Sequence, residues 1–498
     1  YLKNEAAASD VLVESDANLV QNNDASVNSG NITVKRNANL QRLDYNYWGS
    51  PVVGQNFISF SPFTKTNRFY TYDDRDDSFV TIPNLSSFFV PAKGYAILSP
   101  NNYTSTPQVF EGKFIGTPNN GVVKTPMGYS PHPTTGVYGG RNMISNPYPS
   151  NIDLKQLTQN NSSITDGLYY FWTNDARSFQ NNVTATYGEY GNYKVNQYAI
   201  LNALGSTPAT ASATSSTKLP SNIVKPGQGF IIQAKSAGDL VFNNSLRTIA
   251  TKDTSNRDAV FFNRMSSNKK DAADQIDGRY WLSLISPVGA KNVLLVGYVS
   301  DATNDFDVKY DAPIAMSSSD NFYSIVNDKK LSIQGRNSPN IISDRVPLGM
   351  SNFMAGNYKI KLENQDGLFM NNQQKIYIKD NMTGVLKELS GSNDYTFYTD
   401  AGEINGRFEI VYQEESTLGV NQVKKQNVLI FRDNDFFVIQ SNSIIKQIEL
   451  YTASGVLLFN KKDIDDKEYK INTNGFTNGT YFIKLITIDG LNTFKIIK

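Results

Sequence analysis

The chain has 498 residues, more than one hydrophobic core usually supports, so several modules are expected. Its 47 Lys and Arg residues against 46 Asp and Glu residues give a net charge of +1, which provides no overall field for binding nucleic acid or an anionic membrane. Cysteine is absent, which excludes disulfides and thiolate chemistry, and no apolar run reaches the ~18 residues of a transmembrane helix.

The residue types predict an all-β protein. Aromatic residues make up 12% of the chain, with 28 Tyr and 28 Phe, whereas charged residues make up 19%. Short runs of Tyr, Phe, Thr, Val and Ile, separated by Asn, Gly, Ser and Asp, are typical of strands joined by tight turns. We therefore expect several β-sandwich or jelly-roll-like modules in tandem.

Residues 1–41 contain short alternating runs at close spacing, such as Val11 with Val13 and Ile32 with Val34. Such runs suit the end of a β-solenoid, and the alternative is an irregular pair of strands that caps the next module. The chain opens with YLKNEAAASD, without Met or a signal segment. We expect a processed form or the tail of a longer protein, with further rungs before Tyr1 if the solenoid interpretation holds.

Residues 42–255 are expected to hold a diverged duplication. The matches are RFYTYDDRDDSFV (68–80) with LYYFWTNDARSFQ (168–180) at an offset of 100, VPAKGYAIL (90–98) with VKPGQGFII (224–232), and YWGSPV (47–52) with MISNPYPS (143–150). Three anchors in the same order predict two similar β-units. The second unit is lengthened partly by STPATASATSST (206–217), a low-complexity loop that we expect to bury nothing.

Residues 256–413 predict a β-sandwich. Segments such as NYKIKLEN, QKIYIKDNMTG and GRFEIVYQ alternate apolar and polar residues, as half-buried antiparallel strands do. A sandwich of about eight strands fits this length. The polar segment 414–426, which has no aromatic residue, is expected to be a linker.

Residues 427–498 predict a small immunoglobulin-like sandwich of about seven short strands. Gly455, the Asn478-Gly479 pair and Gly490 supply the glycines that hairpin turns demand, with Gly479 expected at positive φ. Along the sixth strand, Tyr481, Ile483 and Leu485 are expected to point one way, and Phe482, Lys484 and Ile486 the other. Most chain ends are loose, but this one should be folded to its last residues.

The sequence offers no clear catalytic set. The one histidine, His132, lies between two prolines in YSPHPTTG, where we expect a loop residue rather than a catalyst. One His without Cys cannot form the usual zinc sites, and no nucleophile elbow, phosphate-binding loop or dinucleotide fingerprint occurs. Paired carboxylates, the minimum for glycoside hydrolysis, stay open. We therefore predict a protein that is not an enzyme.

Two acidic stretches are candidate calcium loops. YDDRDDS places Asp73, Asp74, Asp76 and Asp77 in one turn, and SDATNDFDVKYD (300–311) forms a second group. Calcium takes six or more oxygen ligands, which the loops of β-domains often supply. The alternative for the first stretch is a solvated turn in which the intervening Arg is the counter-charge. The duplicate of this turn keeps one acid, so the ligand set is not repeated.

The three tryptophans bear on carbohydrate binding, because Trp and Tyr faces can stack on sugar rings. Trp48, Trp172 and Trp281 each lie within an apolar run, so we expect them to pack in the core. A carbohydrate-binding or glycan-active extracellular protein stays an alternative, which two carboxylates facing a Tyr/Trp groove would support.

The last 72 residues resemble the type A C-terminal sorting domain of Bacteroidetes proteins exported by the type IX secretion system. IELYTASGVLLF (448–459) is similar to that family's strand, glycine-containing turn and second strand. INTNGFTNGTYFIKLITIDGLNTFKIIK (471–498) is similar to its Gly-x-Tyr-Phe-hydrophobic-Lys strand and its Lys-rich last strand. The family often has a Pro-Asn-Pro segment where this chain reads NVLIFRDNDFFVIQS. Segments further upstream resemble those found before such domains in large flavobacterial cell-surface proteins.

The resemblance implies an export route. Such a protein is transiently periplasmic, crosses the outer membrane through an SprA-type translocon, and is handed to a PorV-type shuttle barrel through residues 427–498. The implied export-signal residues are Gly455, Gly479, Tyr481, Phe482, Lys484, Gly490, Lys495 and Lys498.

We therefore expect a secreted or cell-surface protein whose β-modules serve adhesion or display, with a glycan or other surface ligand as a candidate partner. A third interpretation is purely structural, in which the modules form the base of a solenoid stalk.

Overall fold

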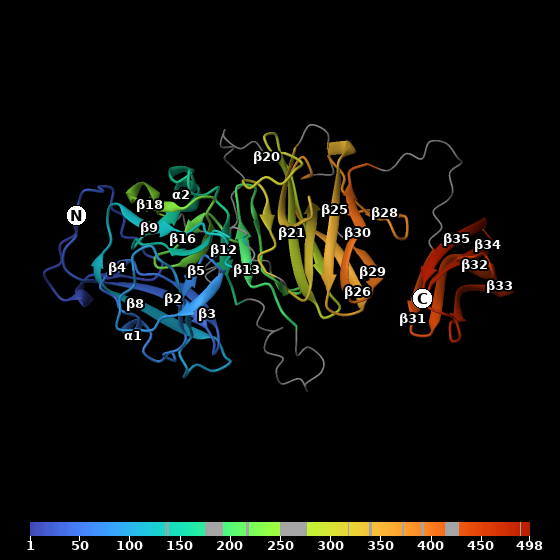
Figure 1. Ribbon diagram of the computed structural model, residues 1–498, viewed down its shortest axis with the longest axis horizontal. Coiled ribbons are helices and arrows are strands. Elements are labelled where there is room, and N and C mark those ends of the chain that lie inside the picture. The colour runs from blue at the N-terminus through green and yellow to red at the C-terminus, as the bar shows by residue number, and fades with distance from the viewer. Residues whose placement is uncertain are drawn as a thin grey trace.

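The computed structural model describes residues 1–134, 136, 139–174, 193–215, 219–249, 276–316, 318–337, 341–370, 373–389, 393–413, 428–488 and 490–498. Nearly all of their regular structure is β-strand, which confirms the prediction of an all-β protein with several modules, and the modules follow one another along the long axis (Figure 1). The helices are short: α1 (Phe57–Phe60), α2 (Leu154–Asn160), η1 (Ala8–Asp10), η3 (Asn244–Leu246) and η4 (Ile341–Ser343).

The first residues form parallel layers that end on the first repeat. β1 (Leu12–Val13) pairs in parallel with β2 (Ile32–Leu40), and a parallel bridge also joins Lys3 to Ser29. Parallel stacking of successive segments is the arrangement of solenoid rungs. β2 then pairs antiparallel with β8 (Gln108–Pro118) along its whole length, and β8 also pairs with β4 (Val52–Val53).

The two halves of the predicted duplication form two sheets with the same strand order. The first has the order β3 (Tyr45–Trp48), β7 (Tyr95–Leu98), β5 (Phe69–Asp73), β6 (Ser78–Thr81). The second has the order β10 (Arg141–Ser145), β17 (Gly229–Gln233), β12 (Tyr169–Trp172), β13 (Tyr198–Leu201), β14 (Ser206–Thr207). Smaller sheets beside them are β16 (Ile223–Val224), β11 (Asn151–Asp153) and β19 (Arg247–Thr248), and β18 (Gly238–Phe242) with β9 (Val123–Met127).

The duplication extends to individual residue pairs. In β5 and β7, Phe69 lies opposite Ile97, and in β12 and β17, Tyr169 lies opposite Ile232, so Phe69 and Tyr169 are counterparts at the offset of 100. Likewise, β3 and β7 pair Trp48 with Tyr95, as β10 and β17 pair Ile144 with Phe230. The Ser178-Phe179 pair of the sequence match lies outside the described residues.

The two sheets meet about a pseudo-two-fold axis. The Gly49 N–H donates to the Gly227 carbonyl at 2.9 Å, and its counterpart, the Ser145 N–H, donates to the Ala92 carbonyl at 2.8 Å. The two acceptors are themselves counterparts, with φ of +64° at Gly227 and +63° at Ala92. The strand pairing therefore shifts the sequence match of 90–98 with 224–232 by one residue, so that Tyr95 corresponds to Phe230. Each repeat therefore donates and accepts at the same place, as in an isologous dimer contact.

The axis has room for one side chain. A Cβ added to Gly49 would overlap the Oγ and Cβ atoms of Ser145. A Cβ on Gly94 would lie 2.5 Å from the Ile144 carbonyl oxygen of the other repeat, and one on its counterpart Gly229 would lie 2.9 Å from the Tyr47 carbonyl carbon. Because backbones approach this closely only where a side chain is missing, the repeats differ at the axis, with Gly in one and Ser in the other.

Each repeat sheet has one face on its own core and the other on a shared core. Trp48 and Phe69 belong to the first repeat's core, and Ile144 and Tyr169 to the second's. The opposite faces of both sheets join one cluster with side chains of the next module, of which Trp281, Leu295 and Ile333 are members. The repeats and the next module are thus packed together rather than strung on linkers.

The next module is a twelve-stranded sheet that curls around a core containing Tyr280, Leu294, Tyr358 and Phe408. Its strands in order are β28 (Val385–Glu388), β27 (Tyr377–Asp380), β30 (Gly402–Val411), β25 (Arg345–Asn352), β23 (Asn321–Val326), β24 (Lys329–Asn337), β21 (Ala290–Val299), β20 (Ile276–Ile285), β26 (Gly356–Gly367) and β29 (Tyr395–Thr399). β15 (Ala211–Ser212) pairs with β21, and β22 (Ala312–Pro313) pairs with β24.

The described part of the low-complexity segment, residues 206–215, differs from the expectation that the segment buries nothing. Thr207 and Thr210 are each 1% exposed, and the Thr210 hydroxyl donates to Asn292 Oδ1 at 2.6 Å. Strand β15, from the same segment, pairs antiparallel with the first residues of the interior strand β21, ahead of the stretch of β21 that pairs with β24. Small residues fit here because the segment lies between two packed modules, where large side chains would not.

The terminal domain has five strands, not the seven segments counted in the sequence: β31 (Val428–Asp433), β32 (Phe436–Thr452), β33 (Leu457–Asn472), β34 (Thr480–Thr487) and β35 (Gly490–Ile497). DFFVIQ and KQIELYT are one bent strand, and GVLLFN and KEYKINT are another, with register irregularities between Gln440 and Ile445. Tyr481, Ile483 and Leu485 point into the core, as expected, and Phe482 points outward. The expected linker 414–426 lies outside the described residues.

We predict that Gly49→Ser destabilises the full chain by about 1–3 kcal/mol, because overpacking at a close contact costs that much. Adding Ser145→Gly should restore most of the loss, since the obstructing atoms are removed. Thermal or denaturant unfolding measures both. A double variant as unstable as Gly49→Ser alone would contradict the contact at the axis.

Candidate functional site

The acidic turn between β5 and β6 splits its carboxylates among different partners. Asp73 accepts from Arg75 Nε at 3.0 Å and from the Arg75 N–H at 3.1 Å, and these hydrogen bonds lower the pKa of Asp73 to about 2. Asp77 accepts from the Tyr72 hydroxyl at 3.0 Å and lies 3.9 Å from Arg141. Asp74 lies against Gly128, and Asp76 is exposed.

Among the described residues, no three His, Cys, Asp or Glu side chains are grouped to hold a metal ion. Calcium at Asp73, Asp74, Asp76 and Asp77 therefore stays a prediction.

The second acidic stretch ties its own loop to the sheet. Asp311 accepts from the N–H groups of Asp307 at 2.7 Å and Gly335 at 2.8 Å. Burial raises the pKa of Asp311 to about 7 despite these donors. Asp301 accepts from the Tyr310 hydroxyl at 2.7 Å. These contacts hold the loop against β24 and give its acids a structural role.

His132 lies in a tight turn, where its Nδ1 accepts from the Thr134 N–H at 3.1 Å. Trp48 and Trp281 are buried, which confirms the expectation that they pack in the core, and Trp281 Nε1 donates to the Ser206 carbonyl at 2.8 Å. Trp172 differs, because it is half-buried and stacks on Tyr47 with ring centres 5.6 Å apart.

An aromatic surface lies beside the pseudo-two-fold axis, on the shared face of the repeat sheets. We define it by its partly exposed members: Tyr45, Tyr70, Tyr72, Phe79, Trp172 and Tyr198. Sequence reasoning missed it, because strand alternation shows which residues share a face but not which strands become neighbours. The repeat could have located part of it, since RFYTYDDRDDSFV and LYYFWTNDARSFQ place Tyr72 and Trp172 at matching positions. It could not have located the rest, because the match sets Phe79 against Phe179, whereas in the sheets Tyr198 takes the place of Phe79.

The aromatic surface repeats the symmetry of the sheets. Tyr72 lies opposite Phe79, as Trp172 lies opposite Tyr198. The first pair has ring centres 5.2 Å apart at 76°, and the second 5.4 Å apart at 80°. The buried Tyr47 lies between the pairs, and its hydroxyl shares a 2.6 Å hydrogen bond with that of Tyr198. The same edge-to-face arrangement therefore occurs once in each repeat.

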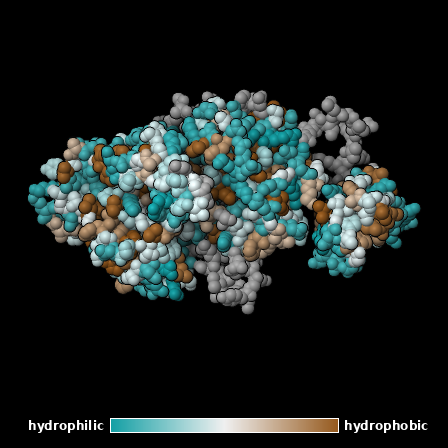
Figure 2. Space-filling model, viewed as in Figure 1, coloured by the Kyte–Doolittle hydropathy of each residue, from teal (hydrophilic) through white to brown (hydrophobic). Residues whose placement is uncertain are grey.

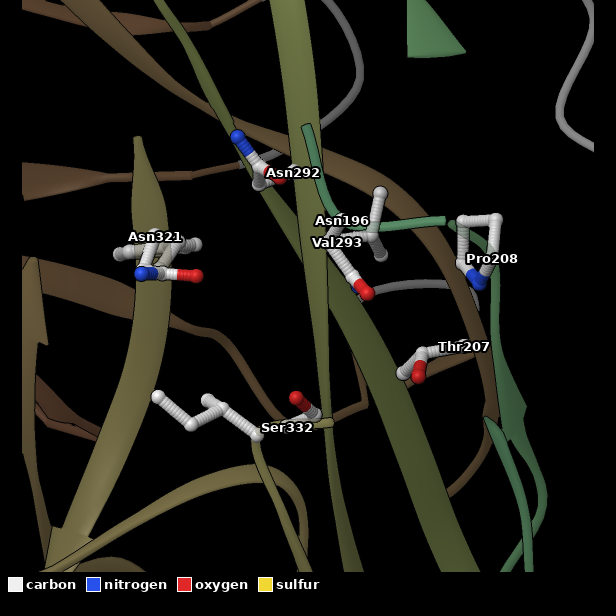
Figure 3. A pocket seen from close by; sticks show the side chains of 9 residues that line it. Asn196, Thr207, Pro208, Asn292, Val293, Asn321 and Ser332 are labelled. Carbon is white, nitrogen blue, oxygen red and sulfur yellow. The ribbon is translucent and has the colours of Figure 1, made fainter. Parts of the chain in front are cut away.

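The pocket in Figure 3 is not a ligand site of useful size. It lies where the second repeat meets the twelve-stranded sheet, and its volume is about 10 Å³. Thr207 and Pro208 line it from the repeat side, and Asn292, Asn321 and Ser332 from the sheet side. A space of this size holds one water molecule at most. Its polar walls help join the two modules.

The terminal domain places the predicted export-signal residues in several roles. Tyr481 is buried, and its hydroxyl donates to the Thr477 carbonyl. On the outer face, Phe482 lies opposite Lys495, and Lys484 pairs with Glu449 at 3.2 Å. Gly455 and Gly490 have φ of +84° and +138°. The Lys498 Nζ donates to the carbonyls of Thr473 and Phe476, each at 2.7 Å.

The expectation that Gly479 sits at positive φ in a turn is wrong. Gly479 does not have a positive φ, and it pairs with Lys498 through two backbone hydrogen bonds of 3.0 Å each. It therefore extends the ladder of β34 and β35. Space around its Cβ position is open. An Asn-Gly pair marks a turn in many hairpins, but here the turn glycine is Gly475, at φ of +91°.

Residues 3–412 match the model of a domain of unknown function, DUF8693, and the chain belongs to this family. The match covers the N-terminal layers, both repeats and the twelve-stranded sheet, and it stops before the terminal domain. A search of curated proteins found no match. In the described part of the chain, no helix is long and apolar enough to cross a membrane.

We predict that Gly479→Val leaves the terminal domain folded, because valine suits an extended residue with free space. Gly455→Val should destabilise this domain by about 1–2 kcal/mol, because a branched residue is strained at positive φ. Amide hydrogen exchange of β34 and β35 in the full chain compares the two. Loss of protection in Gly479→Val alone would contradict the ladder assignment.

Proposed function

We propose that the chain is a non-enzymatic exported protein, in which residues 3–412 act in adhesion or display at the cell surface or in the medium. In this proposal, residues 427–498 are the export signal, read by the outer-membrane translocon and shuttle barrel of a type IX secretion system. We choose this pathway because residues 427–498 resemble the type A sorting domain.

The main structural support is the independence of the terminal domain. Among the described residues, its five strands pair with one another alone, and its core cluster draws on residues of this domain alone. The family match ends at residue 412, before this domain begins. A unit with its own sheet and core can be gripped or removed without disturbing the modules before it.

The position of β35 in its sheet supports the same proposal. Lys498 pairs with Gly479 in both directions, and its side chain closes onto the segment before β34. Among the described residues, β35 pairs with β34 alone, so it is the end strand in the order of this sheet. An edge strand can offer its backbone groups to a partner protein.

The outer surface of the terminal domain is rich in apolar side chains. Leu457 is 47% exposed, and Phe482 is 36% exposed. Both lie opposite Tyr451, in the neighbouring strand β32. Figure 2 shows hydrophobic residues at the surface of this domain. Such a row of apolar residues across adjacent strands favours contact with another protein.

We predict that deleting residues 427–498 leaves residues 1–426 folded but confined to the periplasm of the native host. Fractionation with protease-resistance assays measures location and folding together. A matched control fuses residues 414–498 to a fluorescent protein that carries a signal peptide for the inner membrane, and this fusion should then be exported. Wild-type levels of the truncated chain outside the cell would contradict the proposal.

A further inference from the structure

We propose that the open half of the aromatic surface, formed by Tyr45, Tyr70, Tyr72 and Phe79, is a binding site for the sugar rings of a neutral oligosaccharide. This goes beyond export and display, and it does not depend on the terminal domain.

The first support is the unequal covering of two matching surfaces. In the second repeat, Tyr170 and Ile200 are 2% and 1% exposed, because they join the shared core with Trp281 and Leu295. Their counterparts in the first repeat are more accessible, since Tyr70 is half-buried and Thr81 is exposed. The twelve-stranded sheet therefore covers one copy of this surface and leaves part of the other to solvent.

The second support is the geometry of the rings. Phe79, which is 41% exposed, meets Tyr70 at 6.4 Å and 80°, and Tyr72 at 5.2 Å and 76°. Tyr45 lies 6.0 Å from Tyr70 at 60°. Each ring holds the next at a steep angle, so the set is rigid. A rigid aromatic site loses little conformational freedom when an apolar ring face stacks on it.

The third support is the polar rim. Arg68 donates to the Tyr70 hydroxyl at 3.1 Å, and the Tyr72 hydroxyl donates to Asp77. Asp77 is itself near Arg141, so the local charges oppose one another. Donors and acceptors at the edge of aromatic faces suit a ligand with C–H faces and many hydroxyls. Because the arginines here do not outnumber the four aspartates of the turn, we infer that the ligand is neutral rather than anionic.

The acidic turn favours binding over hydrolysis. A retaining or inverting glycosidase needs two carboxylates aimed at one bond. Here Asp73 is held by Arg75, and Asp77 is held by Tyr72. These two acids are therefore engaged with different groups of the protein, and the proposal includes no cleavage of the sugar.

The experiment titrates the full chain with maltohexaose, cellohexaose and mannohexaose by calorimetry, with polygalacturonate as an anionic probe. Phe79→Ala should weaken binding of the preferred neutral probe about tenfold or more, as loss of a central aromatic anchor does. The matched control is Val80→Ala. Val80 is the next residue of β6, is 45% exposed and points to the opposite face, so this change should leave affinity within about twofold of wild type.

The affinity should also stay the same between about 50 and 500 mM salt, because salt does not screen the binding of an uncharged ligand. Three outcomes would overturn the proposal. They are failure of all three neutral probes to bind, binding that Phe79→Ala leaves intact, and preference for polygalacturonate with strong salt dependence. A fourth outcome would also overturn it. If sedimentation shows a wild-type dimer that Phe79→Ala loses, this face is a contact between copies of the chain.

Discussion

The close contact between Gly49 and Ser145 fixes how the rest of the molecule is assembled. Two backbones can pass this near each other only if one repeat lacks a side chain at the axis, and Gly49 supplies that condition. The reciprocal hydrogen bonds to Gly227 and Ala92 then set the angle between the two sheets. Two similar units thus form one pseudo-symmetric body within a single chain, as two subunits do in a dimer.

The functional asymmetry follows from what packs against this body. Both repeat sheets turn one face to their own core, so their other faces form one continuous surface rich in aromatic residues. The twelve-stranded sheet covers the second repeat's share through Trp281, Leu295 and Ile333. The first repeat's share stays partly open. The two repeats have the same arrangement of rings, and the twelve-stranded sheet covers it in the second repeat and only in part in the first.

Sequence patterns predicted what depends on local alternation and failed where long-range packing decides. The facing of Tyr481 and the burial of Trp48 could be predicted, since they follow from strand periodicity and apolar context. The offset of 100 between Phe69 and Tyr169 could be predicted from the similarity of the two repeats. The merging of seven segments into five strands could not, because a strand can bend without a glycine or proline. The positive φ expected for Gly479 was wrong because an Asn-Gly pair can lie either in a turn or at the start of a strand.

The site was harder to predict than the fold. Tyr72 and Phe79 are close in sequence, but their relation to Trp172 and Tyr198 depends on pairing between segments far apart. The buried Thr207 and Thr210 looked like a loose loop because small polar residues suit both a solvated loop and a tight interface. The boundary expected near residue 255 separates segments that share one core. Composition cannot show such sharing, since it records neither neighbours nor distances.

The most direct measurement of the central claim is amide hydrogen exchange at Gly49 and Ser145 in the full chain. If their reciprocal bonds hold the two repeats together, both amides should be protected and should exchange at similar rates, through the same opening event. Rapid exchange at either amide, or exchange of the two by clearly different openings, would contradict a pseudo-symmetric joint between the repeats.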